Sequence, residues 1–113
     1  MTTLIKKVYH ITFPVSDLKR TVAFYENILG LKKTGEWPNY AEFDVGGTHF
    51  GFEKGGKLEI FLIVDNVDKA YQSLKEKGVK FVTEPKDTHW GARAATIVDP
   101  NGNMFTLEHF KKK

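Results

Sequence analysis

The sequence predicts an α+β fold made of two tandem βαβββ modules. The first observation is an internal repeat: the stretch HITFPVSDL from His10 and the stretch EIFLIVDNV from Glu59 place apolar and turn-forming residues alike. The second is a helical pattern that follows each stretch and ends at a glycine, Gly30 in one half and Gly78 in the other. The third is a set of short strand patterns in each half, broken by Gly-Gly or Pro-Asn-Gly.

The first module is expected to begin with a strand from Val8 to Val15, after which Ser16 and Asp17 can cap a helix. The core-facing stripe of this helix is predicted from residues at helical spacing, namely Leu18, Val22, Tyr25 and Leu29, widened by Phe24 and Ile28. Strands at 31–37, 40–45 and 48–53 complete the module, with Gly46-Gly47 as a hairpin turn.

The second module follows a short linker, Lys54-Gly55-Gly56-Lys57. Its first strand is expected at 58–64, and Asp65 or Asn66 can cap a helix whose apolar face holds Val67, Tyr71 and Leu74. Further strands are predicted at 80–83, 94–98 and 104–110, and the turn 99–102 joins the last two.

The length of the chain favours one domain that covers residues 1–113. A chain of 113 residues can bury one hydrophobic core but not two independent ones, so modules at about 5–53 and 58–110 should share a core or exchange parts between chains. The hydrophobic fraction of 41% is typical of a globular protein, and no window approaches the roughly 20 apolar residues of a membrane span. We therefore expect no membrane partner.

The basic charge is concentrated at the end of the chain. The net charge is +3, and the lysine tail 111–113 supplies three of the 17 basic residues, which leaves 14 basic against 14 acidic residues. Because no arginine-rich face accompanies this solvated tail, nucleic acid is not expected as a partner. The chain has no cysteine, which excludes disulfides and thiolate metal sites, and the absence of a signal-peptide pattern predicts a cytoplasmic protein.

One face of the predicted sheet is unusually polar. Side chains alternate along a strand, so each strand gives one set to the helix layer and one to the opposite face. The opposite face collects ionisable side chains, namely His10, His49, Glu53, Glu59 and Glu108. This face is either simply solvated or part of a ligand cavity, because apolar residues share it, namely Phe61, Ile63, Met104 and Phe110.

Four segments carry a resemblance to a known family: His10 with Val15-Ser16-Asp17-Leu18, Phe24-Tyr25-Glu26-Asn27-Ile28-Leu29-Gly30-Leu31, Val64-Asp65-Asn66-Val67, and Asp99-Pro100-Asn101-Gly102-Asn103. In these segments the chain resembles the vicinal oxygen chelate superfamily, which includes glyoxalases, bleomycin resistance proteins and extradiol dioxygenases. The resemblance covers essentially the whole chain. It implies a curled mixed sheet with a concave cleft, commonly completed in a homodimer, where a divalent metal chelates two neighbouring oxygens of a small-molecule substrate.

The resemblance also implies metal ligands on the first and fourth strands of each module, at His10, Gly51, Glu59 and Thr106. Of these, only His10 and Glu59 can ligate a divalent ion well. Glu108 shares a face with Thr106, about 7 Å farther along the strand, and is the candidate third ligand. We expect either one divalent ion, nickel, zinc, manganese or iron, on His10, Glu59 and Glu108, or no metal and a hydrogen-bonded pair of His10 and Glu59.

Substrate-binding candidates lie in two loop segments and on the last strand: Trp37, Trp90, Arg93 and Thr106. Arg93 can bind a carboxylate or phosphate in bidentate fashion, and Trp90 can stack on a planar ring. Alternatively, both tryptophans belong to an interface or to the core, and Arg93 forms a surface ion pair.

Two functions therefore follow from the sequence. The first is a metal-dependent lyase or isomerase of glyoxalase type, in which Glu59 moves a substrate proton; dioxygenase chemistry fits less well because two histidines and a carboxylate are absent from the matched positions. The second is a metal-free binding protein of the bleomycin-resistance type, with an acidic cleft supplied by Glu53, Glu59 and Glu108. A structural or interaction module is a third reading.

Overall fold

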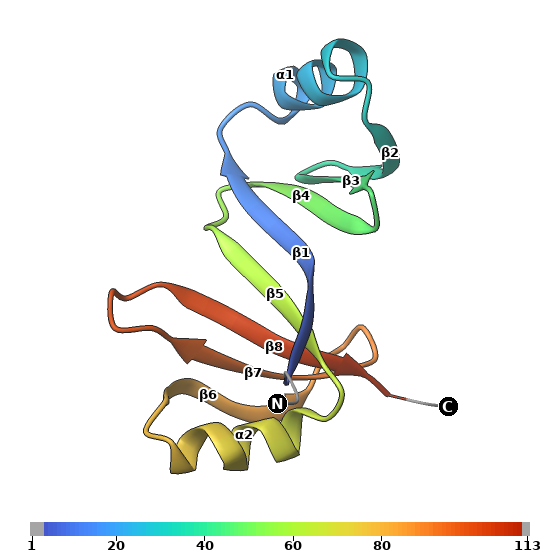
Figure 1. Ribbon diagram of the computed structural model, residues 1–113. Helices are drawn as coiled ribbons and strands as arrows, with labels where there is room; N and C mark the ends of the chain where they lie inside the picture. The colour runs from blue at the N-terminus through green and yellow to red at the C-terminus, as the bar shows by residue number, and fades with distance from the viewer. Residues whose placement is uncertain (1–3, 112–113) are drawn as a thin grey trace. The chain divides into compact units, whose positions relative to one another are not determined.

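The computed structural model describes residues 4–111. Its elements follow the chain in the order of two repeated modules (Figure 1). The first module contains β1 (Ile5–Val15), helix α1 (Leu18–Ala23), the π-helical turn η1 (Phe24–Ile28), β2 (Lys32–Trp37), β3 (Tyr40–Val45) and β4 (Thr48–Lys54). The second contains β5 (Glu59–Val64), α2 (Val67–Glu76), β6 (Lys80–Asp87), β7 (Ala92–Val98) and β8 (Met104–Phe110). The predicted α+β class with eight strands and few helices is confirmed.

Both modules have the same strand topology. The order is β2-β3-β4-β1 in the first module and β5-β8-β7-β6 in the second. The outer pairs are antiparallel hairpins, whereas β1 runs parallel to β4, and β5 runs parallel to β8. A parallel pair needs a long crossover, and this crossover carries the helix of each module.

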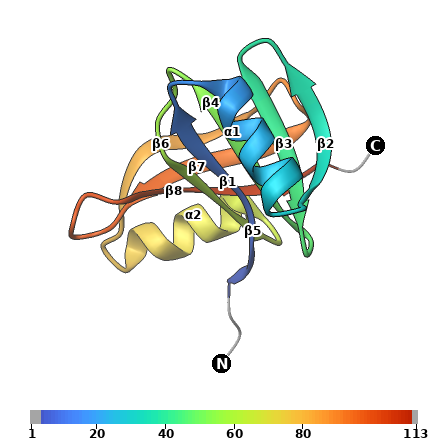
Figure 2. The same ribbon diagram turned by 90° about the horizontal axis from the view of Figure 1, so that it is seen from above.

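Each module builds its own hydrophobic core beneath its helix. In the first, Leu18 and Val22 of α1 pack against strand residues, namely Ala41, Phe43 and Phe52. In the second, Val67 and Ala70 of α2 pack against Val64, Ala95 and Leu107, and α2 lies along its own strands in Figure 2. The alternation of apolar and polar side chains predicted for these strands is therefore correct.

The chain separates into two compact units that differ slightly from the modules. Residues 9–59 form one unit, and the described residues up to Val8 join those from Ile60 onward in the other. Strand β1 starts at Ile5, earlier than the predicted Val8, because Ile5 packs against the core of the second module. Of the predicted lysine tail 111–113, the structure describes Lys111, which forms an ion pair with Asp87 at 2.9 Å. Residues 112–113 lie outside the described part.

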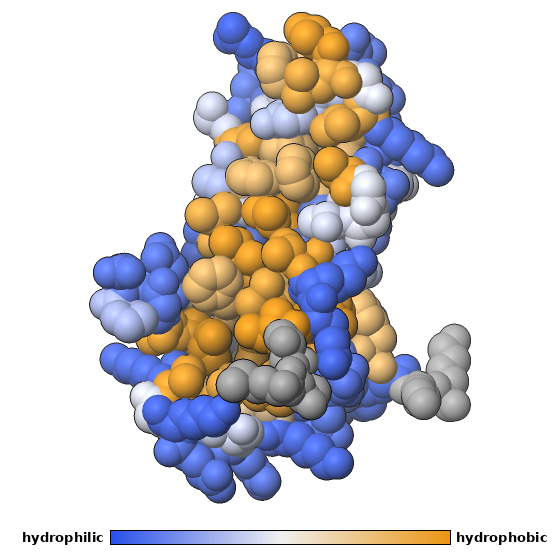
Figure 3. Space-filling view, viewed as in Figure 1, coloured by the Kyte–Doolittle hydropathy of each residue, from blue (hydrophilic) through white to orange (hydrophobic). Residues whose placement is uncertain are grey.

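Beyond Ala23 the prediction for the first helix is wrong in its winding and in part of its core face, although Tyr25 packs against the core as predicted. The backbone N–H of Leu29 bonds to the carbonyl of Phe24, five residues back, so this turn contains one residue more than an α-helical turn. Tyr25 and Leu31 still pack against the core, but three other apolar side chains of this segment do not. Phe24, Ile28 and Leu29, predicted to face the core, are 43%, 72% and 52% exposed, and Figure 3 shows hydrophobic surface over α1 and η1.

The hairpin of β6 and β7 is longer than predicted. It reaches Asp87 and restarts at Ala92, whereas the apolar pattern indicated strands at 80–83 and 94–98. Two register shifts accommodate the polar residues and Pro85, which the edge position of β6 tolerates. Across residues 4–111, no helix is long and apolar enough to cross a membrane.

Candidate functional site

His10 belongs to a hydrogen-bonded group on the face of the first module opposite α1. Nε2 of its ring lies 3.0 Å from Oγ1 of Thr12 and 3.2 Å from the hydroxyl oxygen of Tyr40. The Tyr40 hydroxyl donates a hydrogen bond of 2.9 Å to Oε2 of Glu42. The strand register produces this arrangement, because Thr12 of β1 and Glu42 of β3 both pair with Gly51 of β4.

The missing side chain of Gly51 makes room for this group. A Cβ atom on residue 51 would collide with the Tyr40 hydroxyl and would lie 2.7 Å from Nε2 of His10. Side-chain atoms in proteins do not approach so closely without displacing one another. The Tyr40 hydroxyl therefore occupies the space that a side chain at position 51 would fill.

Burial is the largest influence on the ionisation of His10 and Tyr40. It lowers the pKa of the His10 imidazole, an effect that the charge of Glu42 opposes and that His49 reinforces. Burial raises the pKa of the Tyr40 hydroxyl, and Glu42 raises it further through its charge and its hydrogen bond. Both shifts favour the neutral forms, so this group works as a set of hydrogen-bonding partners around one carboxylate.

Trp37 lies beside this group but remains open to solvent. Its ring is 54% exposed and lies 5.7 Å from the ring of Tyr40, measured between centroids. The Trp37 ring also covers Gly35, where a Cβ would be 2.7 Å from a ring carbon. The exposed Trp37 ring thus lies next to half-buried polar groups, and its predicted contact with a ligand stays a prediction.

The second module carries a buried acid on β8. Glu108 is only 2% exposed, and Nε1 of Trp90 donates to its Oε2 at 3.4 Å. Burial raises the pKa of the Glu108 carboxyl, and the hydrogen bond from Trp90 opposes that shift. Two predicted site residues, Trp90 and Glu108, are thus in contact.

Thr106 and Glu59 have simpler surroundings. The hydroxyl of Thr106 lies 3.2 Å from that of Thr96 on the neighbouring strand β7, so these two neutral groups satisfy each other. Glu59 is half-buried at the start of β5. Within residues 4–111, no three His, Asp or Glu side chains are grouped closely enough to hold a metal ion. The ligand set of His10, Glu59 and Glu108 stays a prediction.

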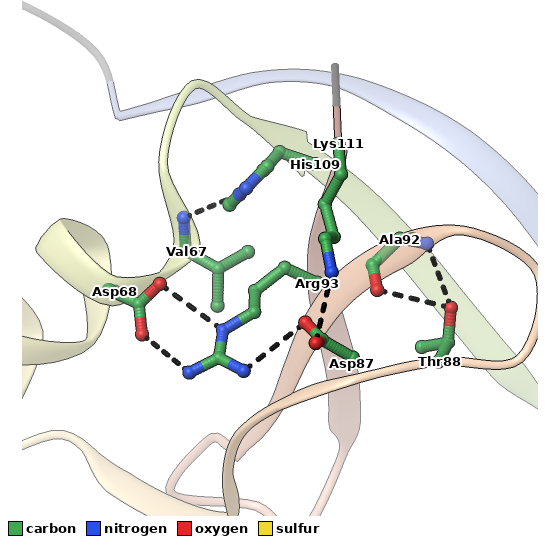
Figure 4. Close-up of polar contacts among 8 residues, drawn as sticks. All are labelled: Val67, Asp68, Asp87, Thr88, Ala92, Arg93, His109 and Lys111. Atoms are coloured by element: carbon green, nitrogen blue, oxygen red, sulfur yellow. Dashed lines mark hydrogen bonds and ion pairs between the residues drawn. The ribbon is translucent and has the colours of Figure 1, made fainter. Parts of the chain in front are cut away.

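Arg93 of β7 is held by two carboxylates (Figure 4). Its Nε and one terminal nitrogen bond both oxygens of Asp68 in α2, at 3.2 and 3.0 Å, and its other terminal nitrogen lies 3.3 Å from Asp87. Lys111 bonds the second oxygen of Asp87. This is the surface ion pair that was the alternative to a substrate-binding arginine, and a substrate anion would have to compete with both aspartates.

The sequence did not predict two contacts, one in each module: the hydrogen bond between His109 and Val67, and the contact between Tyr40 and His10. Nδ1 of His109 accepts a 2.8 Å hydrogen bond from the backbone N–H of Val67, at the start of α2 and 42 positions away in the chain. Tyr40 shares a predicted strand face with Glu42, and that alternation is the one signal that pointed to their contact. The reach of Tyr40 to His10 depends on how β1, β4 and β3 are aligned, which no local pattern specifies.

Comparisons with known proteins agree with this fold. A family model described as Glyoxalase/Bleomycin resistance protein/Dioxygenase superfamily matches residues 7–107. The chain is 35% identical to the uncharacterized protein YraH of Bacillus subtilis, over 89% of this chain and 96% of YraH. It is 26% identical to the lactoylglutathione lyase of Salmonella typhimurium, over 89% of this chain and 90% of the lyase.

Among solved structures, methylmalonyl-CoA epimerase from Mycobacterium tuberculosis superposes with a TM-score of 0.80 at 19% identity, over 99% of this chain and 93% of the epimerase. At that identity the likeness concerns the fold alone. The family match spans both modules, including the strands that carry His10 and Glu59. The chain belongs to the Glyoxalase/Bleomycin resistance protein/Dioxygenase superfamily.

Proposed function

We propose that this chain is a glyoxalase-like small-molecule-binding protein that holds its ligand through neutral hydrogen-bonding groups around His10, without a metal ion on that side chain. The observation that carries the proposal is the position of the Tyr40 hydroxyl, in the space of the side chain absent from Gly51. The ring of Trp37 next to Tyr40 supplies an exposed apolar surface beside these polar groups. Such a combination is typical of sites that bind small organic molecules.

The divalent metal of the superfamily fits the residues of the first module poorly. Gly51 supplies no donor atom, and Nε2 of His10 already lies within hydrogen-bond distance of Thr12 and Tyr40. In the second module the hydroxyl of Thr106 is paired with that of Thr96 and carries no charge. A divalent ion prefers charged oxygen or unengaged imidazole ligands, which these positions do not supply.

A metal-dependent lyase or isomerase is the second candidate. It is favoured by the equivalent positions of His10 and Glu59 in the two modules. His10 lies two residues before Thr12, which pairs with Gly51 of the parallel strand. Glu59 lies two residues before Phe61, which pairs with Thr106 of the parallel strand. The relative from Salmonella typhimurium is a lactoylglutathione lyase. This candidate requires Glu59 as the proton-transferring base and Glu108 as a further ligand.

Metal content decides between these candidates. We would purify the untagged protein without chelator, reconstitute it with nickel, zinc, manganese or iron, and measure bound metal by elemental analysis in the wild type, His10→Ala and His89→Ala. The exposed His89 is the matched control. The proposal predicts equal, substoichiometric metal in all three proteins. One metal per chain that His10→Ala loses and His89→Ala keeps would establish the metal-dependent candidate instead.

Ligand binding tests the proposal directly. Thermal shifts with a panel of small carboxylates and planar cations are expected to include compounds that stabilise the wild type but not His10→Ala or Tyr40→Phe. Trp37→Ala should weaken the same compounds, because it removes the exposed ring. For the second module by itself we propose that Trp90, Arg93 and Thr106 contact a small-molecule ligand, which at Arg93 has to compete with Asp68 and Asp87, and replacing each should weaken its binding.

The proposal includes a cytoplasmic homodimer. Exposed apolar side chains of the first module, namely Phe24, Ile28 and Leu29, support self-association, since large exposed apolar patches usually mark interfaces. Sedimentation velocity should give the mass of two chains. Ile28→Glu is expected to shift the protein to the monomer.

A further inference from the structure

Three heavy-atom contacts connect four side chains of the first module in one sequence. Oε2 of Glu42 lies 2.9 Å from the Tyr40 oxygen, which lies 3.2 Å from Nε2 of His10. The same nitrogen lies 3.0 Å from Oγ1 of Thr12. A hydrogen bond needs one proton between each pair of atoms, so the protons in this sequence can be counted.

The Glu42 carboxylate determines where the Tyr40 proton lies. The Tyr40 hydroxyl donates to Oε2 of Glu42, so its single proton points to Glu42. The Tyr40 oxygen then has no proton for His10 and can only accept from it. The 3.2 Å contact between the Tyr40 oxygen and Nε2 therefore requires a proton on Nε2, because two lone pairs at that distance would repel. Thr12 can accept from the same N–H or turn its own hydroxyl proton elsewhere.

We infer that Glu42, acting through the Tyr40 hydroxyl, holds neutral His10 in the tautomer that carries its proton on Nε2, so that this nitrogen is a hydrogen-bond donor and not a metal ligand. Glu42 is in this sense a positioning residue. The inference deepens the proposed function and rests on the same side chains. It also gives the ligand a chemical requirement: the group that meets Nε2 must be an acceptor, such as a carbonyl or carboxylate oxygen.

Gly51 is necessary for this arrangement. A Cβ at position 51 would collide with the Tyr40 hydroxyl and approach Nε2 of His10 to 2.7 Å, so a larger residue would separate the two atoms that share the proton. Gly51 lies between Thr12 and Glu42 in the strand register. The absence of a side chain at Gly51 therefore leaves the space in which the Tyr40 hydroxyl contacts His10.

Nitrogen NMR measures the tautomer without any ligand or metal. Protein labelled with ¹⁵N-histidine would be studied at about pH 8, where an ordinary histidine with a pKa near 6.5 is neutral. Signals of His10 are assigned from their loss in His10→Gln. In the wild type we expect Nε2 to be the protonated nitrogen of His10, with the other tautomer undetected.

Two variants release the constraint in different ways. Glu42→Leu frees the Tyr40 proton to point at Nε2, and Tyr40→Phe removes the acceptor while the hydroxyl of Thr12 stays within hydrogen-bond distance of Nε2. In both we expect the tautomer protonated on Nδ1 to become detectable, with a clear change in both ring nitrogen shifts. Glu53→Gln is the matched control, because Glu53 pairs with Tyr40 in the strand register but lies outside the hydrogen-bonded sequence. Its His10 signals should equal those of the wild type.

A wild-type His10 protonated on Nδ1 would overturn the inference. So would ring nitrogen shifts in Glu42→Leu and Tyr40→Phe that both equal those of the wild type. Because the measurement uses ligand-free protein, these results are separate from failure of the proposed function, which the metal and ligand experiments report. A protein that binds no panel compound but shows the expected tautomer change would contradict only the function.

Discussion

The Tyr40 hydroxyl lies where a Cβ on residue 51 would be, so the two would collide. Gly51 and Tyr40 lie on adjacent strands but are not paired directly opposite one another. The wild-type pair is one small and one large residue that share a single volume. The two positions should therefore be energetically coupled.

Gly51→Ala is expected to lower the free energy of unfolding by about 1–3 kcal/mol, the usual cost of adding atoms to a packed site. In a Tyr40→Ala background the same substitution should cost less, since the competing hydroxyl is gone and the His10 ring, the other close neighbour, can move into the vacated space. Urea denaturation of the two single variants and the double variant measures this coupling. Additive effects would show that Tyr40 moves aside without cost.

Glu108 should make the protein less stable as the pH rises. Burial raises its pKa in the folded state, so the folded protein binds this proton more tightly than the unfolded chain. The stabilisation is complete below the ordinary carboxyl pKa and is lost as the pH rises through the raised value. Denaturation between about pH 4 and about pH 8 should show the free energy of unfolding of the wild type falling relative to that of Glu108→Gln, a difference that removes the contribution of His10 common to both proteins.

Trp90→Phe provides the complementary test of the same acid. Loss of the indole N–H removes the hydrogen bond that counteracts burial, so the pKa of Glu108 should rise further. The fall in stability with pH should then extend to higher pH than in the wild type. An unchanged profile would mean that the 3.4 Å contact contributes nothing to the ionisation of Glu108.

His109→Ala should destabilise the start of α2. The variant leaves the backbone N–H of Val67 without its acceptor, and an unsatisfied buried group costs about 1–3 kcal/mol. Amide hydrogen exchange should accelerate at Val67 and in the first turn of the helix. His89→Ala, at an exposed turn position, is the control and should exchange like the wild type.

Arg93 should govern how the protein responds to acid through Asp68. The hydrogen bonds and charge of Arg93 lower the pKa of the Asp68 carboxyl, so their stabilisation is present above the ordinary aspartate pKa and disappears as the pH falls through the lowered one. In Arg93→Gln, NMR titration should show Asp68 with a higher pKa. The same pKa in both proteins would mean that this ion pair does not persist in solution.

Much of the fold follows from local patterns. The repeat and the strand alternation predict which residues are buried, and Phe43, Phe52 and Leu107 are indeed fully enclosed. The candidate site follows only in part: His10 was identified, whereas the roles of Tyr40 and Gly51 depend on three strands in register. Register is a long-range property, set by pairing across the sheet, and a single strand's sequence does not contain it.

The π-helical turn escaped prediction for a different reason. The apolar residues of this turn have the spacing and the composition of an amphipathic α-helix. Only the hydrogen bond from the Leu29 N–H to the Phe24 carbonyl reveals the wider turn. A spacing rule assumes a constant number of residues per turn. It fails wherever one residue is added without a change in polarity.

The wide turn at 24–28 holds one residue more than α-helical winding would need. Deleting one residue there would return the chain to α-helical winding and rotate the downstream side chains, Ile28 among them, by about 100°. A change of a single codon in this segment would thus exchange one exposed surface for another while the core residues Leu18 and Val22, which precede the turn, keep their places. Homologues that differ by one residue here should therefore differ in the apolar surface that they expose and in the position of Leu31, which packs against this core.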